Sequence, residues 1–280
     1  MKILKSKQIW LRNTAVMNDY SEVRYGTSCF EGAYNTEPGT NFKTALESCF
    51  PGLAKEVTRE IFDDWRPIIR DDTYVTCLSE HLPDEDQHGR LSMWRAYGGD
   101  AGVALVIRGA VMFSNTQVLK VISSPVAYRQ PDQVGVAINK VAQTITIHTD
   151  FLKGISRDDA RTAVFNMFLF GILCTKHPGF LEEREWRAIA SPQMYPTPHC
   201  ISGIEVIRGV PQRVLKIDLK NHPEQGLVGL AIPELIDRII IGPCQFPAII
   251  RAAFLELLQE AGVPDADERI VDSKIPLRQA

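Results

Sequence analysis

Two glutamates two residues apart are the first feature of the sequence that could do chemistry. Glu183 and Glu185 lie in the stretch FLEEREWRAI, residues 180–189, and the segment EREWRAIA (183–190) is predicted to be a strand. Side chains two apart on a strand point to the same side of a sheet, so the two carboxylates are expected to share a face. Two carboxylates held close together can divide labour, one acting on a proton and the other stabilising positive charge.

A plainer interpretation of the same stretch is an exposed strand start. The two glutamates would then pair with Arg184 and Arg187. The strand itself predicts that Trp186 points to the opposite side, into the core. The E-x-E spacing is common, so the spacing alone favours this interpretation over a catalytic one.

A second candidate is the polar stretch SEHLPDEDQHG, residues 79–89, whose imidazole and carboxylate groups suit zinc, manganese or iron. Its spacing matches no metal-binding motif, and its Pro and Gly are typical of loops. A solvated loop is therefore the favoured interpretation. The alternative is a metal-dependent hydrolase or nuclease built on His81, Asp84, Asp86 and His88.

A third candidate, LSMWRAYGGDAGVAL (residues 91–105), combines two aromatic residues with a Gly-Gly turn. Trp94 and Tyr97 offer stacking surface, and glycine lets the backbone approach a ligand closely. The stretch is not G-x-G-x-x-G and precedes a predicted strand, which disfavours a Rossmann site. A turn with two core aromatic residues explains it equally well. A fourth stretch, MNDYSE (17–22), is more often a helix cap than a site.

The composition bounds the classes of protein that these residues could serve. The chain has 280 residues, 45% hydrophobic and 23% charged, with a net charge of −3, which predicts a globular protein without a global attraction to nucleic acid or anionic membrane. Six cysteines without C-x-x-C spacing, and an N-terminus without a signal-peptide pattern, predict a cytoplasmic protein. The most apolar run, residues 164–174, is too short to span a membrane.

The elements that must position these residues follow no steady strand–helix alternation. This order predicts one α+β domain over residues 1–280, with a mixed sheet flanked by helices. Helices are expected at 40–63 with a break at Pro51, at 133–153, at 157–176 and at 247–262, and a short helix or turn at 91–98. Strands are expected at 9–11, 73–80, 102–109, 120–129 with a break at Pro125, 183–190, 214–219, 238–243 and 269–278.

Taken together, the stretches resemble a known family. ILKSKQIWLRN…MNDYSEVRYG, YVTCLSE…LSMWRAYGGDAGVALVI, KHPGFLEEREWRAI, IIIGP and SKIPLR stand in the order typical of the DUF2971 family of bacterial, phage-defence-associated proteins. The resemblance implies an ADP-ribosyltransferase-like fold and NAD as co-substrate, in an abortive-infection or toxin effector. The acceptor would be a protein or nucleic acid and not a membrane, and an antitoxin or regulator could hold the protein silent.

The resemblance also implies roles for individual residues. Glu185 maps onto the glutamate that stabilises the positive charge on the nicotinamide ribose, and Glu183 onto the one that orients or deprotonates the acceptor. A shift of one strand register would exchange the two. Ser79, Trp94 and Tyr97 would line the NAD cleft. Asn18, Asp19 and Glu22 match the family's MND-x-x-E turn, as architecture or as a cleft wall.

One departure from the family pattern motivates a rival function. Family members usually begin with a strand carrying a Tyr-His-Tyr-Thr-like motif that grips the cofactor, and this sequence begins inside the following helix. A non-catalytic binding or regulatory module on the same fold is therefore the main alternative to a transferase.

Overall fold

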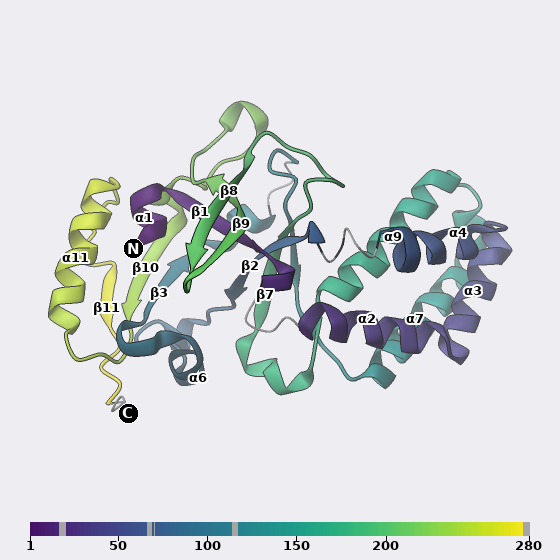
Figure 1. The fold of residues 1–280 in the computed structure, drawn as a ribbon, viewed down its shortest axis with the longest axis horizontal. Coiled ribbons are helices and arrows are strands. Elements are labelled where there is room, and N and C mark those ends of the chain that lie inside the picture. Colours follow the sequence, from purple (N-terminus) through teal and green to yellow (C-terminus); the bar gives the residue numbers. More distant parts are fainter. Residues whose placement is uncertain (17–20, 66–68, 70, 114–116, 277–280) are drawn as a thin grey trace. The chain divides into compact units, whose positions relative to one another are not determined.

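The structure is a computed structural model that describes residues 1–16, 21–65, 69, 71–113 and 117–276 (Figure 1). The chain divides into two compact units. Unit 1 comprises Met1–Leu11, Thr76–Ser123 and Tyr195–Ala280, and unit 2 comprises Arg12–Val75 and Ser124–Met194. The single domain predicted over residues 1–280 stays a prediction.

Helices build most of unit 2. They are α2 (Ser21–Tyr34), α3 (Glu37–Cys49), α4 (Leu53–Arg59), the π-helical turn η2 (Glu60–Asp64), α7 (Pro131–Ile147), α8 (Thr149–Leu152) and α9 (Arg157–Leu173). Their start signals are local. Pro131 opens α7, where a missing N–H costs nothing, and Ser156 caps α9 by accepting the Asp159 N–H at 3.1 Å.

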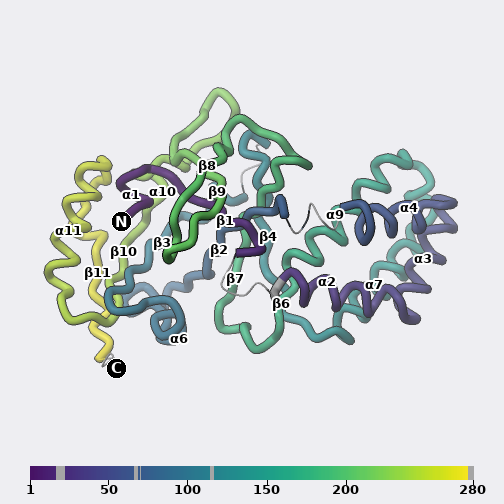
Figure 2. The backbone as a smooth tube through the Cα atoms, viewed as in Figure 1, coloured from purple at the N-terminus to yellow at the C-terminus, as the bar shows by residue number. Residues whose placement is uncertain are grey.

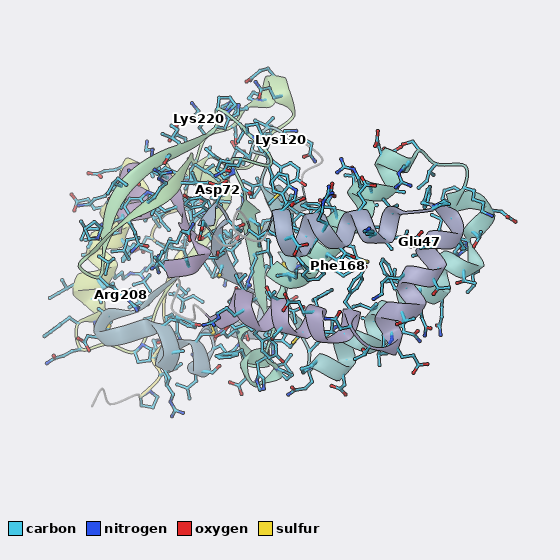
Figure 3. All side chains as sticks on the ribbon, turned by 45° about the vertical axis from the view of Figure 1, so that its right-hand side comes forward. Glu47, Asp72, Lys120, Phe168, Arg208 and Lys220 are labelled. Carbon is cyan, nitrogen blue, oxygen red and sulfur yellow. The ribbon has the colours of Figure 1, made fainter. Side chains whose placement is uncertain are left out.

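Phe168 of α9 lies within the helical core of unit 2 (Figure 3). Its ring meets those of Phe30, Tyr34 and Phe42 edge-on, with centroids 5.9, 5.3 and 5.7 Å away. Gly171 lets α2 approach α9, because a Cβ at this position would lie 2.3 Å from the Phe30 ring. This packing fixes the end of α9 and the strand that follows it.

Unit 2 contains the whole of β5 (Ala127–Tyr128), β6 (Thr175–Lys176) and β7 (Glu185–Ala190) and only parts of β1 (Gln8–Asn13), β2 (Tyr74–Ser79) and β4 (Ile122–Pro125). The end of β1 pairs antiparallel with the start of β2, and β7 lies between β4 and β2 in the strand order. A separate parallel pair joins β5 to β6, with Tyr128 opposite Lys176. The turns η1 (Thr14–Val16) and η7 (Pro178–Glu183) complete the unit.

Unit 1 is built around a sheet of three strands in the order β11-β10-β3. β10 (Ile236–Ile241) runs antiparallel to β3 (Val103–Ile107) and parallel to β11 (Ile270–Asp272). The apolar run Ile239–Ile241 is wholly buried, and α11 (Pro247–Glu260) lies beside β10 and β11 (Figure 2). α1 (Lys2–Ser6) precedes β1.

A β-hairpin and several short turns make up the rest of unit 1. β8 (Cys200–Ile207) pairs antiparallel with β9 (Val210–Asp218) through Arg208 and Gly209, whose φ values of 51° and 80° fit a two-residue hairpin turn. The short elements are η3 (Pro83–Glu85), α6 (Leu91–Met93), the π-helical turn η4 (Trp94–Gly98), η5 (Gly99–Ala101), η6 (Gly109–Phe113), η8 (Pro223–Gln225) and α10 (Ile232–Leu235).

Most of the predicted elements are confirmed, and so is the mixed helix-and-sheet class. The prediction that one helix covers 157–176 is wrong at its end, because α9 stops at Leu173 and Lys176 belongs to β6. The strand predicted at 269–278 is shorter, and α2 and β8 were not predicted. Among the described residues, no helix has the length and apolar character that a membrane crossing needs.

Candidate active site

Four charged residues of unit 2 form a compact cluster, which we call the charge cluster: Lys176, Glu183, Glu185 and Arg187. Lys176 ends β6, Glu183 ends η7, and Glu185 and Arg187 lie on β7. Lys176, Glu185 and Arg187 are only 4, 5 and 3% exposed. Charged side chains are rarely buried to this degree unless they are paired.

The buried face of β7 is its charged face. Glu185, Arg187 and Ile189 are buried, while Trp186 is only half-buried. The expectation that Trp186 occupies the core side of this strand is therefore wrong. Arg187 can take that place because its charge is met there: Nε donates to Glu185 Oε1 at 2.7 Å and Nη1 donates to the Leu173 carbonyl.

Lys176 joins the two glutamates that the sequence singles out. Its Nζ lies 2.6 Å from Glu183 Oε2 and 3.1 Å from Glu185 Oε2. The Phe180 ring covers the same ammonium, with its centroid 4.7 Å from Nζ, a cation–π contact. One buried ammonium thus holds two carboxylates and an aromatic ring.

The two glutamates meet because of a turn and not because of strand alternation. Glu183 lies before β7, and Arg184 between them adopts the left-handed conformation with φ 43° and ψ 53°. A residue with a Cβ rarely adopts this conformation, which costs on the order of 1 kcal/mol. The strand predicted over residues 183–190 therefore starts only at Glu185. The turn at Arg184, before the strand, brings the two carboxylates together.

Tyr128 of β5 is the neutral member of the site. Its hydroxyl oxygen accepts the backbone N–H of Glu185 at 2.8 Å. Burial raises the pKa of Tyr128, and the nearby charges of Glu185 and Glu183 raise it further, against the effects of that hydrogen bond and of Lys176. The phenol is therefore protonated at neutral pH and can donate its own proton.

The charge cluster is balanced, since two cations face two anions. Burying such a group costs desolvation energy that the pairing offsets only while every partner stays in place. Glu183 is the more accessible of the two carboxylates: its side chain is 17% exposed, and that of Glu185 is 5% exposed. A ligand would therefore meet Glu183 first.

A family comparison places this cluster inside a recognised segment. Residues 93–188 match the DUF2971 family. The family is described as a protein of unknown function. No curated protein and no solved structure matches the chain. The predicted resemblance to DUF2971 is thus confirmed over residues 93–188, and all four residues of the charge cluster lie in this DUF2971 segment.

Two of the three residues predicted to bind NAD also lie in the DUF2971 segment, but they belong to unit 1. Trp94 is 8% exposed and its Nε1 donates to the His88 carbonyl at 2.7 Å. Its ring is packed so closely that a Cβ at Gly242 would lie 2.7 Å from it. Tyr97, in contrast, is 55% exposed. Trp94 is an anchor of unit 1, and Tyr97 is the aromatic residue with an accessible face.

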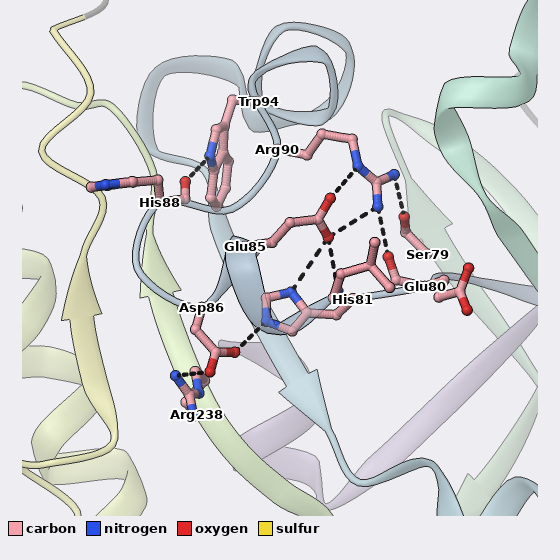
Figure 4. A network of polar contacts seen from close by, with 10 residues as sticks. Ser79, Glu80, His81, Glu85, Asp86, His88, Arg90, Trp94 and Arg238 are labelled. Atoms are coloured by element: carbon pink, nitrogen blue, oxygen red, sulfur yellow. Dashed lines mark hydrogen bonds and ion pairs between the residues drawn. The ribbon is translucent and has the colours of Figure 1, made fainter.

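Ser79, the third predicted NAD contact, precedes the DUF2971 segment and belongs to a polar network in unit 1 (Figure 4). Its hydroxyl oxygen accepts from Arg90 Nη1 at 3.1 Å. Arg90 also donates from Nε to Glu85 Oε1 at 2.8 Å and from Nη2 to Glu85 Oε2 at 3.1 Å. Ser79 is therefore placed to fix Arg90.

The same network orders the stretch for which a solvated loop was favoured. His81 Nε2 lies 2.8 Å from Asp86 Oδ1, its Nδ1 lies 3.9 Å from Glu85 Oε2, and Arg238 Nη1 lies 3.1 Å from Asp86 Oδ2. Five side chains contact one another in turn along this path, which we call the charge chain: Arg238, Asp86, His81, Glu85 and Arg90. Both carboxylates face arginines.

The metal-site alternative finds no group of donors in the described part of the chain. Over these residues, no three or more His, Cys, Asp or Glu side chains are grouped so that they could hold a metal ion. His88 Nδ1 lies 2.7 Å from the Ser273 carbonyl, away from the His81–Asp86 pair. The hydrolase or nuclease interpretation is left without a ligand set here.

Two residues of the site, Lys176 and Tyr128, have no counterpart among the predicted site residues. Part of the MND-x-x-E turn lies outside the described residues. The only signal for Lys176 is its place in the stretch KHPGFLEEREWRAI. Arg187 was considered as a surface partner of the glutamates, and the structure pairs it with Glu185 in the interior. Asn18 and Asp19, and the side chain of Glu22, lie outside the described residues.

Proposed function

We propose that the chain is an NAD-dependent ADP-ribosyltransferase-like enzyme, a bacterial anti-phage or toxin effector that modifies a protein or a nucleic acid. The observation that carries the proposal is the convergence of Glu183 and Glu185 on one ammonium group in the DUF2971 segment. The resemblance noted in the sequence supplies the NAD chemistry. In that chemistry the bond from ribose C1′ to nicotinamide breaks, positive charge develops at C1′, and a nucleophile of the acceptor bonds there.

The geometry favours moving the ribose-stabilising role, which the resemblance gave to Glu185, to Glu183. Both oxygens of Glu185 face cations, Oε1 with Arg187 at 2.7 Å and Oε2 with Lys176 at 3.1 Å, so its negative charge is largely compensated. Glu183 is more exposed and lies at the end of a turn. We therefore assign stabilisation of the ribose charge to Glu183, and we assign to Glu185 the positioning of Lys176 and Arg187.

The residues suggested for NAD fit the proposal unequally. Tyr97 offers an exposed ring to a ligand, whereas the Trp94 ring is enclosed and the Ser79 hydroxyl accepts from Arg90. Of the three, Tyr97 is the residue whose ring is open to a ligand within unit 1, and its contact with NAD stays a prediction. Trp94 and Ser79 serve the packing and hydrogen bonding of unit 1.

The test is transfer of label from NAD labelled on its adenylate phosphate to macromolecules of a bacterial lysate. Wild type is expected to retain label on protein or nucleic acid. Glu183→Gln keeps the side-chain size and is expected to fold and to lose at least about a hundredfold in transfer, the usual scale for a lost electrostatic stabiliser. Glu182→Gln, at an exposed neighbouring position, is the matched control and should transfer normally. The proposal would be refuted if the wild type transferred no label to the macromolecules of the lysate, or if Glu183→Gln transferred as much label as the wild type.

A second function, a non-catalytic binding or regulatory module, is favoured by one specific observation. The charge cluster balances its own charges, and three of its four side chains are at most 5% exposed, as in a purely structural ion network. This alternative predicts no NAD binding by calorimetry. It also predicts that Glu183→Gln changes stability without changing any activity.

A further inference from the structure

Residues 177–184, between β6 and β7, form an exposed segment that we call the strap. The residues that flank it are buried, Lys176 at 4% and Glu185 at 5%. Within the strap, Phe180 is 38% and Leu181 is 61% exposed, although both are large and apolar. An exposed segment thus lies between the two buried ends of the charge cluster.

Three backbone N–H groups of the strap donate to acceptors within the strap itself, so these hydrogen bonds can move with it. The Gly179 N–H donates to His177 Nδ1 at 3.1 Å, and the Phe180 N–H donates to the His177 carbonyl at 3.0 Å. At the other end the Arg184 N–H donates to the Leu181 carbonyl at 3.2 Å. Residues Pro178–Glu183 of the strap form a short 3₁₀ helix, a structure with poorer hydrogen-bond geometry than an α-helix.

The two ends of the strap differ: side-chain contacts hold its start, and a left-handed residue stands at its end. At its start, His177 is held against the helices of unit 2 by an edge-on contact with Tyr25, 5.7 Å between ring centroids, and by Gln130 Nε2 at 3.4 Å from its Nε2. At its end, Arg184 adopts the left-handed conformation. Strained backbone of this kind persists only while surrounding contacts hold it.

Lys176 supplies the contacts that hold the strap down. Its Nζ lies 2.6 Å from Glu183 at the strap's end and 4.7 Å from the Phe180 ring centroid at its middle. The same Nζ keeps Glu185 at 3.1 Å. When Glu183 leaves, the buried ammonium is therefore still paired with a carboxylate, which removes the largest penalty for breaking a buried ion pair.

We propose that residues 177–184 are a strap that opens over the charge cluster, with the Lys176–Glu183 pair as its latch. Opening releases Glu183 and Phe180 together, relaxes Arg184, and uncovers Lys176 and Glu185 to a ligand. The closed form is the one described by the structure. The inference does not require NAD to be the ligand.

Hydrogen exchange at single amides tests the strap in the full chain without any ligand. The reporters are the Phe180 and Arg184 amides inside the strap, and the Val126 amide, which donates to the Glu185 carbonyl at 2.9 Å, reports the strand beneath. Glu183→Gln is expected to accelerate exchange at both strap amides about tenfold, because local opening sets the exchange rate of such amides. Val126 should change by less than about twofold.

Two further variants keep the test decisive. Glu182→Gln removes a charge of the same kind within the strap at an exposed side chain and should leave all three amides unchanged. Phe180→Leu keeps an apolar side chain but loses the ring over Lys176, and should accelerate the strap amides by a smaller factor than Glu183→Gln. Unchanged strap exchange in Glu183→Gln, or equal acceleration at Val126, would overturn the proposal. Since no NAD is present, this result is independent of the transfer assay.

Discussion

The charge cluster of unit 2 and the charge chain of unit 1 both pair carboxylates with basic side chains, but in different surroundings. In the cluster, Lys176 and Glu185 are both 5% exposed at their side chains. In the chain, His81 is 25% and Asp86 is 37% exposed. Water can reach the chain and solvate a carboxylate whose partner is lost. It cannot do so at Glu185, so similar distances carry different energetic weight.

The difference suggests different tasks. An arrangement open to water can orient a loop cheaply and tolerate change, as the charge chain does for residues 79–90 (Figure 4). In a buried and balanced arrangement, the loss of any one side chain leaves another charge without compensation. A ligand or a moving segment can also change which charges are paired. This contrast is why we place the proposed chemistry at the cluster.

The largest expected effect is that of Glu185→Gln, which tests whether the charge cluster is closed to water. The change leaves Arg187 and Lys176 facing a neutral amide in the interior, which should lower the free energy of unfolding by about 3–5 kcal/mol. Urea unfolding followed by circular dichroism measures it. A loss below about 1 kcal/mol would mean that water reaches Glu185 and that the cluster is no more buried than the chain.

The matched change in unit 1 is Glu85→Gln, with a smaller expected effect. Glu85 accepts from Arg90 and from the Leu82 N–H at 3.1 Å, and its side chain is 12% exposed. The amide keeps one acceptor oxygen and Arg90 keeps the Glu80 carbonyl, so a loss of about 1–2 kcal/mol is expected. Added salt should shrink this loss but not that of Glu185→Gln. Equal losses in both variants would remove the contrast.

The same contrast marks the limit of what the sequence could predict. Helical periodicity and start signals predicted α3, α7 and α11, because those features are local. The two-residue strand β6 follows α9 without a break signal, and so Lys176 was assigned to the helix. The left-handed Arg184 has no sequence marker, since Gly or Asn is usual there. The pairing of Glu183 with Lys176 depends on both.

Burial of charge was the other property that local pattern could not supply. Glu185 and Trp186 alternate on β7 as expected, yet the apolar side chain is the more exposed of the two. The reason is tertiary: Arg187 and the Leu173 carbonyl provide partners that a surface strand would lack. Patterning predicted the strand, and only the packed neighbours decide which of its faces is inside.

Tyr128→Phe sharpens the comparison at the edge of the cluster. It removes the oxygen that accepts the Glu185 N–H at 2.8 Å and should cost about 1 kcal/mol near neutral pH. Burial raises the pKa of Tyr128 above 10.0, so its contribution to stability is complete below pH 10 and is lost as the pH rises through the folded pKa. The free energy of unfolding in urea should therefore fall more for the wild type than for the variant as the pH rises above about 10. Parallel pH profiles for the two proteins would show that the phenol lies outside the cluster's field.

Asp64→Asn gives the smallest expected effect and sets the scale for an exposed pair. Arg59 Nε lies 3.3 Å from Asp64 Oδ2, a distance close to that between Lys176 and Glu185, but the two side chains are 67% and 52% exposed. In water the pairing gains little and salt screens it, so the free energy of unfolding should fall by no more than about 0.5 kcal/mol. The measurement is the same urea titration, at low and at high salt. A loss above about 1 kcal/mol would show that distance alone predicts the strength of an ion pair in this protein, and burial would then lose its explanatory role for Glu185.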